Sequence, residues 1–74
     1  MKLKYAREAA GYTQESLVYK LNESMSCTLR NYQNIEYGIG IPSVTLALLI
    51  CSILNIDPKD VDEWKLHRSP KSKN

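Results

Sequence analysis

The segment TLRNYQNIEYG, residues 28–38, concentrates side chains that donate and accept several hydrogen bonds at once. In a helix, at about 100° per residue, Tyr32 and Ile35 share one face. The roughly opposite face carries Arg30, Gln33, Asn34 and Tyr37. Guanidinium and amide groups suit the binding of a polar partner such as nucleic acid. A face that meets only water would be expected to carry Glu–Lys pairs instead. The alternative interpretation is that this polar face is solvated and has no partner.

Caps and turn formers divide the chain into five expected helices. They are expected over residues 2–10, 13–22, 28–37 and 43–55, and from Asp57 onward. Thr13 and Thr28 are suitable N-caps, and Gly11 and Gly38 suit the helix ends that precede a turn. The pattern contains no strand-like alternation and therefore predicts an all-α fold.

The fourth expected helix is apolar almost all round. One row already supplies the stripe that a helix buries against a core: Val44, Ala47, Leu48, Cys51 and Leu54. A second row would then be exposed: Leu46, Leu49 and Ile53. We expect this second row to form an isologous dimer interface. The alternative is that the fifth helix and Trp64 cover it within one chain.

The composition limits the class of protein. Seventy-four residues with 43% apolar content make one domain with a small core. Cys27 and Cys51 lie in apolar patterns, not in a metal-ligand spacing, so no zinc, other cofactor or disulfide is expected. The chain start lacks the apolar segment of a signal peptide, and the longest apolar run, residues 46–51, is too short to span a bilayer. We expect a soluble, cytoplasmic protein without a membrane partner.

Charge is distributed unevenly, although the net charge is only +2. Residues 67–74 are expected to be a disordered basic tail, which either solubilises the chain or contacts phosphate. The chain has one histidine, His67, and lacks a metal-ligand cluster or a phosphate-binding glycine loop. The sequence therefore indicates neither an enzyme nor a small-molecule substrate.

The motifs GYTQESL, IEYG, IPS and NIDP follow one another in an order that resembles the helix-turn-helix domain of the Cro/repressor-like (XRE) family of regulators. The resemblance covers about residues 3–64. It implies a five-helix, lambda-repressor-like domain over residues 1–66, with helix 28–37 in the major groove of double-stranded DNA. It also implies a homodimer on a near-palindromic operator, repression as the simplest outcome, and a bacterial or phage-derived, nucleoid-associated protein.

Individual roles follow from this resemblance and from the chemistry of the base edges. Base contacts are expected from Leu29, Arg30, Gln33 and Asn34. In such a groove a guanidinium binds guanine, an amide binds adenine and an apolar side chain contacts a thymine methyl group. Contacts with the phosphate backbone of the DNA are expected from Thr13, Gln14, Thr28 and Tyr37. Arg7 and Glu36 are expected to form a partly buried ion pair that joins the first helix to the end of the third.

The segment NESMS, residues 22–26, enlarges the turn between the second and third helices compared with the family pattern. It is expected to contact DNA through Asn22, Ser24 or Ser26, a partner through Met25, or nothing.

A second departure is Tyr32, where the family usually has an aliphatic residue, so its hydroxyl must reach solvent or a polar partner. The altered turn and the apolar fourth helix leave a second function open. It is a protein-interaction adaptor of the same fold, anti-repressor or antitoxin-like, that acts through the apolar face of helix 43–55.

Overall fold

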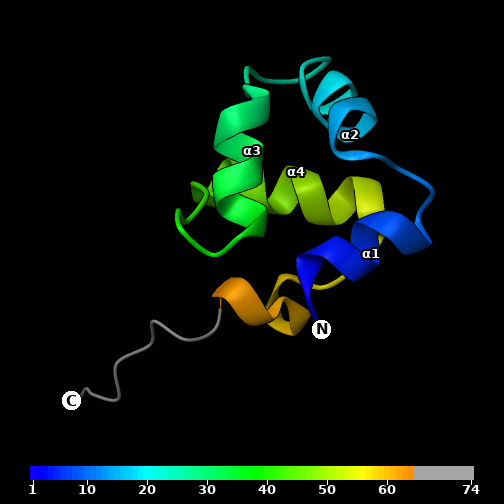
Figure 1. Ribbon diagram of the computed structural model, residues 1–74, viewed down its shortest axis with the longest axis vertical. Helices are drawn as coiled ribbons and strands as arrows, with labels where there is room; N and C mark the ends of the chain where they lie inside the picture. Colours follow the sequence, from blue (N-terminus) through cyan, green and yellow to red (C-terminus); the bar gives the residue numbers. More distant parts are fainter. Residues whose placement is uncertain (65–74) are drawn as a thin grey trace.

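The computed structural model describes residues 1–64, which form four α-helices followed by two short 3₁₀ turns. The elements are α1 (Leu3–Ala9), α2 (Gln14–Leu21), α3 (Leu29–Glu36), α4 (Val44–Leu54), η1 (Pro58–Asp60) and η2 (Asp62–Trp64). The expected all-α fold is confirmed. α4 crosses behind α3 and runs toward α1 (Figure 1). The predicted basic tail, residues 67–74, and the predicted domain boundary at residue 66 lie outside the described residues.

Side-chain caps fix where three of the helices begin. The hydroxyl oxygens of Thr13, Thr28 and Ser43 each accept a hydrogen bond from a backbone N–H in the first turn of the following helix, at 3.0, 3.0 and 3.2 Å. Such a cap satisfies one of the N–H groups that a helix start leaves without a partner. α4 ends at Asn55, whose φ of 59° lies in the left-handed region that asparagine tolerates.

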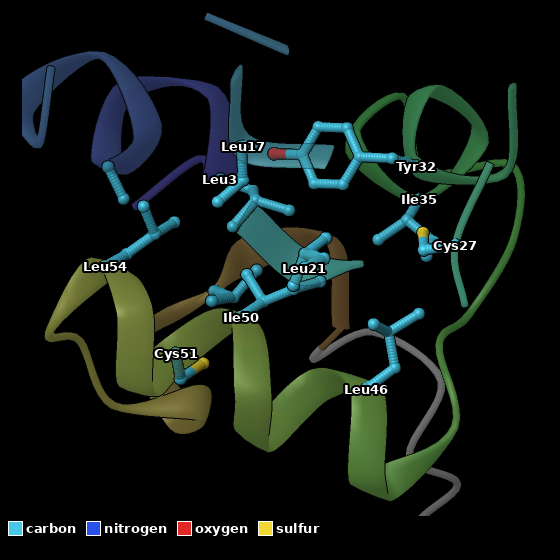
Figure 2. Close-up of a cluster of buried hydrophobic side chains, with 12 residues drawn as sticks. Leu3, Leu17, Leu21, Cys27, Tyr32, Ile35, Leu46, Ile50, Cys51 and Leu54 are labelled. Atoms are coloured by element: carbon cyan, nitrogen blue, oxygen red, sulfur yellow. The ribbon is translucent and has the colours of Figure 1, made fainter. Parts of the chain in front are cut away.

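One hydrophobic core joins all four helices. Figure 2 shows its side chains converging from α1, α2, α3 and α4. The most deeply buried are Leu3, Leu17, Leu21, Tyr32, Ile35, Ile50 and Val61. Because α2 and α3 both contribute to this cluster, their crossing is held by the same burial that stabilises the domain. The polar face of α3 therefore has a rigid support.

The expected fifth helix takes a different form in residues 57–64. Asp57 caps η1 by accepting the Lys59 N–H at 2.9 Å, but Val61 is extended, with φ −85° and ψ 112°, and separates η1 from η2. Val61 is fully buried, and the neighbouring Asp62 N–H donates to the Met1 carbonyl at 2.9 Å. The segment therefore does not continue as an α-helix. It buries Val61 and forms a backbone hydrogen bond to Met1 instead.

Asn22 organises the enlarged turn between α2 and α3. Its side-chain amide donates to the carbonyls of Val18 and Cys27 at 2.8 and 2.7 Å, and its oxygen accepts from the Cys27 N–H at 3.3 Å. Met25 is half-buried and packs against the core, so this side chain is used within the chain and not held out for a partner. The turn is thus a defined structure.

Removing the Asn22 amide should therefore loosen the turn. We expect Asn22→Ala to lower the free energy of unfolding by about 1 kcal/mol, because it leaves the Cys27 backbone groups without partners. Glu23→Ala, one residue along, removes only an exposed ion pair with Lys20 and should change the free energy of unfolding by less than about 0.5 kcal/mol. Urea unfolding of both variants tests this. Equal stabilities would contradict the role given to Asn22.

The structure corrects the predicted orientation of α4. Leu46, expected in an exposed row, is only 5% exposed and lies in the core (Figure 2). Leu49 and Ile53 are half-buried and pack against the same core. Leu46 is therefore unavailable to the predicted dimer interface, because Leu46, Ile50 and Leu54 follow one another at every fourth position on the inward face.

Candidate nucleic-acid interface

α3 presents its polar side chains on the side opposite its buried residues. Arg30 is exposed, and within residues 1–64 its side chain forms no hydrogen bond or ion pair. Leu29, Gln33 and Asn34 are half-buried, and Tyr37, which follows the helix, is 61% exposed. The residues expected to contact bases thus come from one helix and share one flank, with Arg30 the most accessible of them.

The only carboxylate on α3 is withdrawn from this flank. Glu36 is 5% exposed and receives two hydrogen bonds from the guanidinium of Arg7 on α1, from Nε to Oε1 at 2.8 Å and from Nη2 to Oε2 at 3.2 Å. Arg7 is also buried, and its Nη1 donates to the Tyr12 carbonyl at 2.8 Å. Because the pair neutralises itself inside the protein, the outer flank keeps the positive charge of Arg30 and α3 adds no exposed carboxylate to it.

Two further donors complete the shell around the Glu36 carboxylate. The Tyr32 hydroxyl donates to Oε1 at 2.8 Å, and the Gln14 amide donates to Oε2 at 2.9 Å. Burial alone would raise the pKa of Glu36, but the hydrogen bonds from Arg7, Tyr32 and Gln14 outweigh it and hold that pKa below its usual value. Burial, together with the bond to Glu36, raises the pKa of Tyr32.

The lowered pKa of Glu36 makes the stability of the domain depend on pH in the acid range. A carboxyl group whose folded pKa lies below its ordinary 4.5 contributes stability that is complete above 4.5 and is lost as the pH falls through the folded pKa. We therefore expect the melting temperature to fall steeply below about pH 4.5. In Glu36→Gln, which cannot titrate at this site, the decline should be shallower.

Thermal unfolding followed by circular dichroism between about pH 3 and pH 7 measures this slope. Glu8→Gln is the matched control, because Glu8 is exposed on α1 and should leave the acid dependence as it is in the wild type. If Glu36→Gln and the wild type lose stability in parallel, another group sets the acid limit.

Gln14 and Gln33 link α2 to α3 at the edge of the polar flank. The Gln33 amide donates to Gln14 Oε1 at 3.1 Å, and Gln14 Nε2 also lies 3.5 Å from the Tyr37 hydroxyl. Gln14 was expected to reach a phosphate, and the structure instead turns its amide toward α3 and Glu36. Gln33 retains a second N–H for a partner, because an amide carries two.

The starts of α2 and α3 offer a second kind of polar contact. The hydroxyls of Thr13 and Thr28 cap these helices, and Thr13 forms a reciprocal capping box with Ser16. The first backbone N–H groups of each helix have no partner within the helix, and they carry the positive end of the helix dipole. An anionic group such as phosphate is the chemistry these two positions accept.

The sequence interpretation missed two contributors to this site: the Tyr12 carbonyl and the Tyr32–Glu36 hydrogen bond. The last had a signal, because residues four apart in a helix are neighbours and Tyr32 was already recognised as needing a polar partner. The Tyr12 carbonyl had none, since any residue can supply a backbone oxygen.

Two helices held by a common core, with the second presenting a polar flank, have the arrangement of a helix-turn-helix domain. A family model described as helix-turn-helix matches residues 3–61. The uncharacterised HTH-type transcriptional regulator YgzD of Bacillus subtilis (strain 168) is 38% identical over 60 residues, which are 81% of this chain and 85% of that protein. No solved structure matched.

The chain belongs to this helix-turn-helix family, the XRE family of DNA-binding regulators. The predicted resemblance is confirmed, and the family is one of regulators and not of enzymes. Both cysteines, Cys27 and Cys51, are buried and unpaired, and burial raises the pKa of the Cys51 thiol. No helix within residues 1–64 has the length and apolar character needed to cross a bilayer.

Proposed function

We propose that this DNA-binding regulator recognises a specific operator by placing α3 in the major groove. The observation that carries the proposal is the flank of α3, where Arg30 is exposed while the one carboxylate of the helix is buried against Arg7. A negative charge on that flank would be repelled by the phosphates, and the fold removes it. The name of the relative, a transcriptional regulator, supports the same function.

Base edges are read by a small set of side chains in this proposal. Arg30 binds the O6 and N7 atoms of guanine, and Asn34 binds adenine through its amide. Gln33, whose side chain is hydrogen-bonded to Gln14, contacts a base edge as well. Leu29 contacts a thymine methyl group at the start of the helix. Phosphates bind at the first turns of α2 and α3, at the positions of Thr13, Gln14 and Thr28, with Tyr37 at the far end of α3.

Two copies acting together account for specificity. One small module forms few base contacts, whereas two recognition helices about 34 Å apart read a near-palindromic site. Occupation of such a site excludes other proteins from the same DNA without any further contact, so repression is the simplest outcome. Because the protein must share a compartment with its DNA, we place it at the bacterial nucleoid.

Selection of bound duplexes from a random pool tests the proposal. We expect enrichment of an inverted repeat, and binding to the enriched duplex that weakens with salt by roughly 0.9 log units per log unit for each phosphate contact. A protein that is folded by circular dichroism yet enriches no sequence would contradict sequence-specific binding. The alternative, a protein-interaction adaptor, would then be favoured by the exposed apolar side chains of Ile41, Val44 and Leu48.

A further inference from the structure

Two side-chain hydrogen bonds connect the buried carboxylate of Glu36 to the polar flank of α3. Gln14 Nε2 donates to Glu36 Oε2 at 2.9 Å, and Gln33 Nε2 donates to Gln14 Oε1 at 3.1 Å. Glu36 is 5% exposed, whereas Gln14 and Gln33 are half-buried where α2 meets α3. We call these three residues, Glu36, Gln14 and Gln33, the amide relay. It extends from the interior of the domain to its surface.

The chemistry of a carboxylate fixes the direction of both bonds in the amide relay. An ionised carboxylate only accepts hydrogen bonds, so the half of the Gln14 amide that faces Glu36 must be its NH2 group. The Gln14 oxygen then faces Gln33, which must turn its own NH2 group inward. The Tyr37 hydroxyl, 3.5 Å from Gln14 Nε2, imposes no direction because a hydroxyl both donates and accepts. The relay therefore leaves Gln33 one amide orientation where an isolated glutamine has two.

The start of the amide relay is held in place by donors on both carboxylate oxygens of Glu36. Arg7 Nε and the Tyr32 hydroxyl each donate to Oε1 at 2.8 Å, and Arg7 Nη2 donates to Oε2 at 3.2 Å. Burial opposes ionisation, but these bonds and the one from Gln14 outweigh it and keep the pKa of Glu36 below its ordinary value. The carboxylate is thus an acceptor at neutral pH, and the direction of the relay does not vary.

We propose that Glu36 and Gln14 are positioning residues that make Gln33 select adenine at one base pair of each half-site. The inference rests on the proposed function, in which the polar flank of α3 lies against base edges. Gln33 keeps its oxygen and its second N–H for a partner, and within residues 1–64 that oxygen accepts no hydrogen bond. One acceptor beside one donor matches the N6 amino group and N7 of adenine. Guanine presents two acceptors, O6 and N7, and leaves the Gln33 oxygen without a donor.

The amide relay acts on specificity because a free glutamine can turn its amide to suit either base. With the NH2 group outward it donates to guanine, and with the oxygen and one N–H outward it matches adenine. The bond from Gln33 to Gln14 restricts this rotation before DNA binds, so less side-chain entropy is lost on binding. Adenine binding is strengthened, and guanine binding has to break the relay.

Glu36→Gln should reverse the amide relay. The new amide oxygen should take the place of Oε1, which accepts from both Arg7 and Tyr32, so the new NH2 group should face Gln14. Gln14 then turns its oxygen toward position 36 and its NH2 group toward Gln33, which turns its own NH2 group outward. Two donors there match O6 and N7 of guanine. The preference at this base pair should change from adenine to guanine.

Gln14→Glu combined with Glu36→Gln should restore the original direction. The carboxylate then lies in the middle of the amide relay and accepts from the amide at position 36 and from Gln33. Gln33 again turns its NH2 group inward, and the preference should return to adenine. An acidic residue suits the first turn of α2. Near phosphates it should weaken binding to every sequence alike, so base preference, and not affinity, is the measurement.

Gln14→Ala tests the amide relay without changing the buried carboxylate. It removes the half-buried middle member and leaves Glu36 bonded to Arg7 and Tyr32. Gln33 is then free to turn, so most of its preference for adenine over guanine should be lost. Glu15→Gln is the matched control for Glu36→Gln, because it makes the same change at an exposed position of α2 outside the relay. Its base preferences should equal those of the wild type.

Competition titrations against duplexes that carry each base at every operator position measure these preferences. Gln33→Ala identifies the base pair that Gln33 reads, where the wild type should prefer adenine over guanine by about 5- to 150-fold. Circular dichroism at the titration temperature shows which variants are folded. If Glu36→Gln is not folded, Gln14→Ala and Gln33→Ala decide the outcome.

The results separate the amide relay from the function on which it rests. A wild-type protein without any sequence preference would contradict the proposed function and the relay together. An operator preference that Gln33→Ala changes at one base pair, but that Gln14→Ala leaves as it is, would overturn the relay alone. So would a Gln14→Ala variant that binds every sequence equally more weakly, because Gln14 would then contact only phosphate. A folded Glu36→Gln variant that still prefers adenine would overturn it as well.

Discussion

Replacing Arg30 with alanine should weaken binding to the selected operator about 5- to 150-fold per half-site, which corresponds to roughly 1–3 kcal/mol, without lowering the melting temperature. Arg30 is exposed, and its side chain forms no hydrogen bond or ion pair within residues 1–64. The folded protein therefore loses no polar interaction when the side chain is removed, and alanine is the better helix former. The whole effect should appear in binding, as a loss of preference at one base pair in each half-site.

Two variants separate base recognition from simple attraction to phosphate. Lys4→Ala removes the same charge from an exposed position on α1 and should leave the base preference unchanged. Arg30→Lys keeps the charge on α3 but loses the two parallel donors that match guanine, so it should retain binding to random DNA and lose discrimination. Competition titrations against single-base variants of the operator measure both. If Arg30→Ala weakens binding equally for every sequence, Arg30 contacts phosphate and not a base.

The positions of the α-helices were predictable because their boundaries are local. Thr13, Thr28 and Ser43 each have a hydroxyl that can satisfy the first turn of a helix, and each caps one in the structure. The distribution of side chains on α3 was also local, since Tyr32 and Ile35 share one face of the helix and both are buried. Sequence periodicity could therefore establish which side of this helix faces outward.

The orientation of α4 could not be predicted for the opposite reason. A helix that is apolar nearly all round has no polar stripe to mark its outer side, so two rows competed as the buried one. Leu46 and Ile50 entered the core, while Val44 and Leu48 remained exposed. The outcome depends on where α1, α2 and α3 leave space, and this is tertiary information.

The segment after Asp57 shows a similar limit. Its cap, its proline and its acidic first turn are typical of an α-helix start, and η1 does begin there. The helix ends because Val61 is buried in the core and because the Asp62 N–H donates a hydrogen bond to the Met1 carbonyl. Residues about sixty positions apart in the sequence meet here, and no local pattern announces such a contact.

For the candidate site, the sequence identified the helix and its outward flank but not how its side chains are held. Gln14 and Gln33 were both interpreted as groups that reach outward, whereas their amides bond to each other and to Glu36. An amide can serve a phosphate, a base or another amide equally well, because it both donates and accepts. Only the distance between α2 and α3 decides among these partners.

Removal of Arg7 should have the largest effect on stability of any single change considered. Arg7→Ala leaves the Glu36 carboxylate, which is only 5% exposed in the native protein, with just the donors Tyr32 and Gln14. Breaking a buried pair in this way costs about 3–5 kcal/mol, because a charge without its counter-charge remains in a poorly solvating interior. At roughly 4–8 °C per kcal/mol for a domain of this size, the melting temperature should fall by roughly 12–40 °C.

The same variant should preserve base preference in whatever fraction of the protein stays folded, because Arg7 lies on α1 and contacts Glu36 and Tyr12, not the outer flank of α3. Lys4→Ala, one turn earlier on the same helix, should melt within a few degrees of the wild type, since Lys4 is exposed. Arg7→Met combined with Glu36→Met tests the cause. If the stranded charge is responsible, the double variant should recover much of the stability that Arg7→Ala loses, since no buried ion is left unpaired. A double variant as unstable as the sum of the two single changes would instead mean that the hydrogen-bonded shell around Glu36 contributes more than the charge it neutralises.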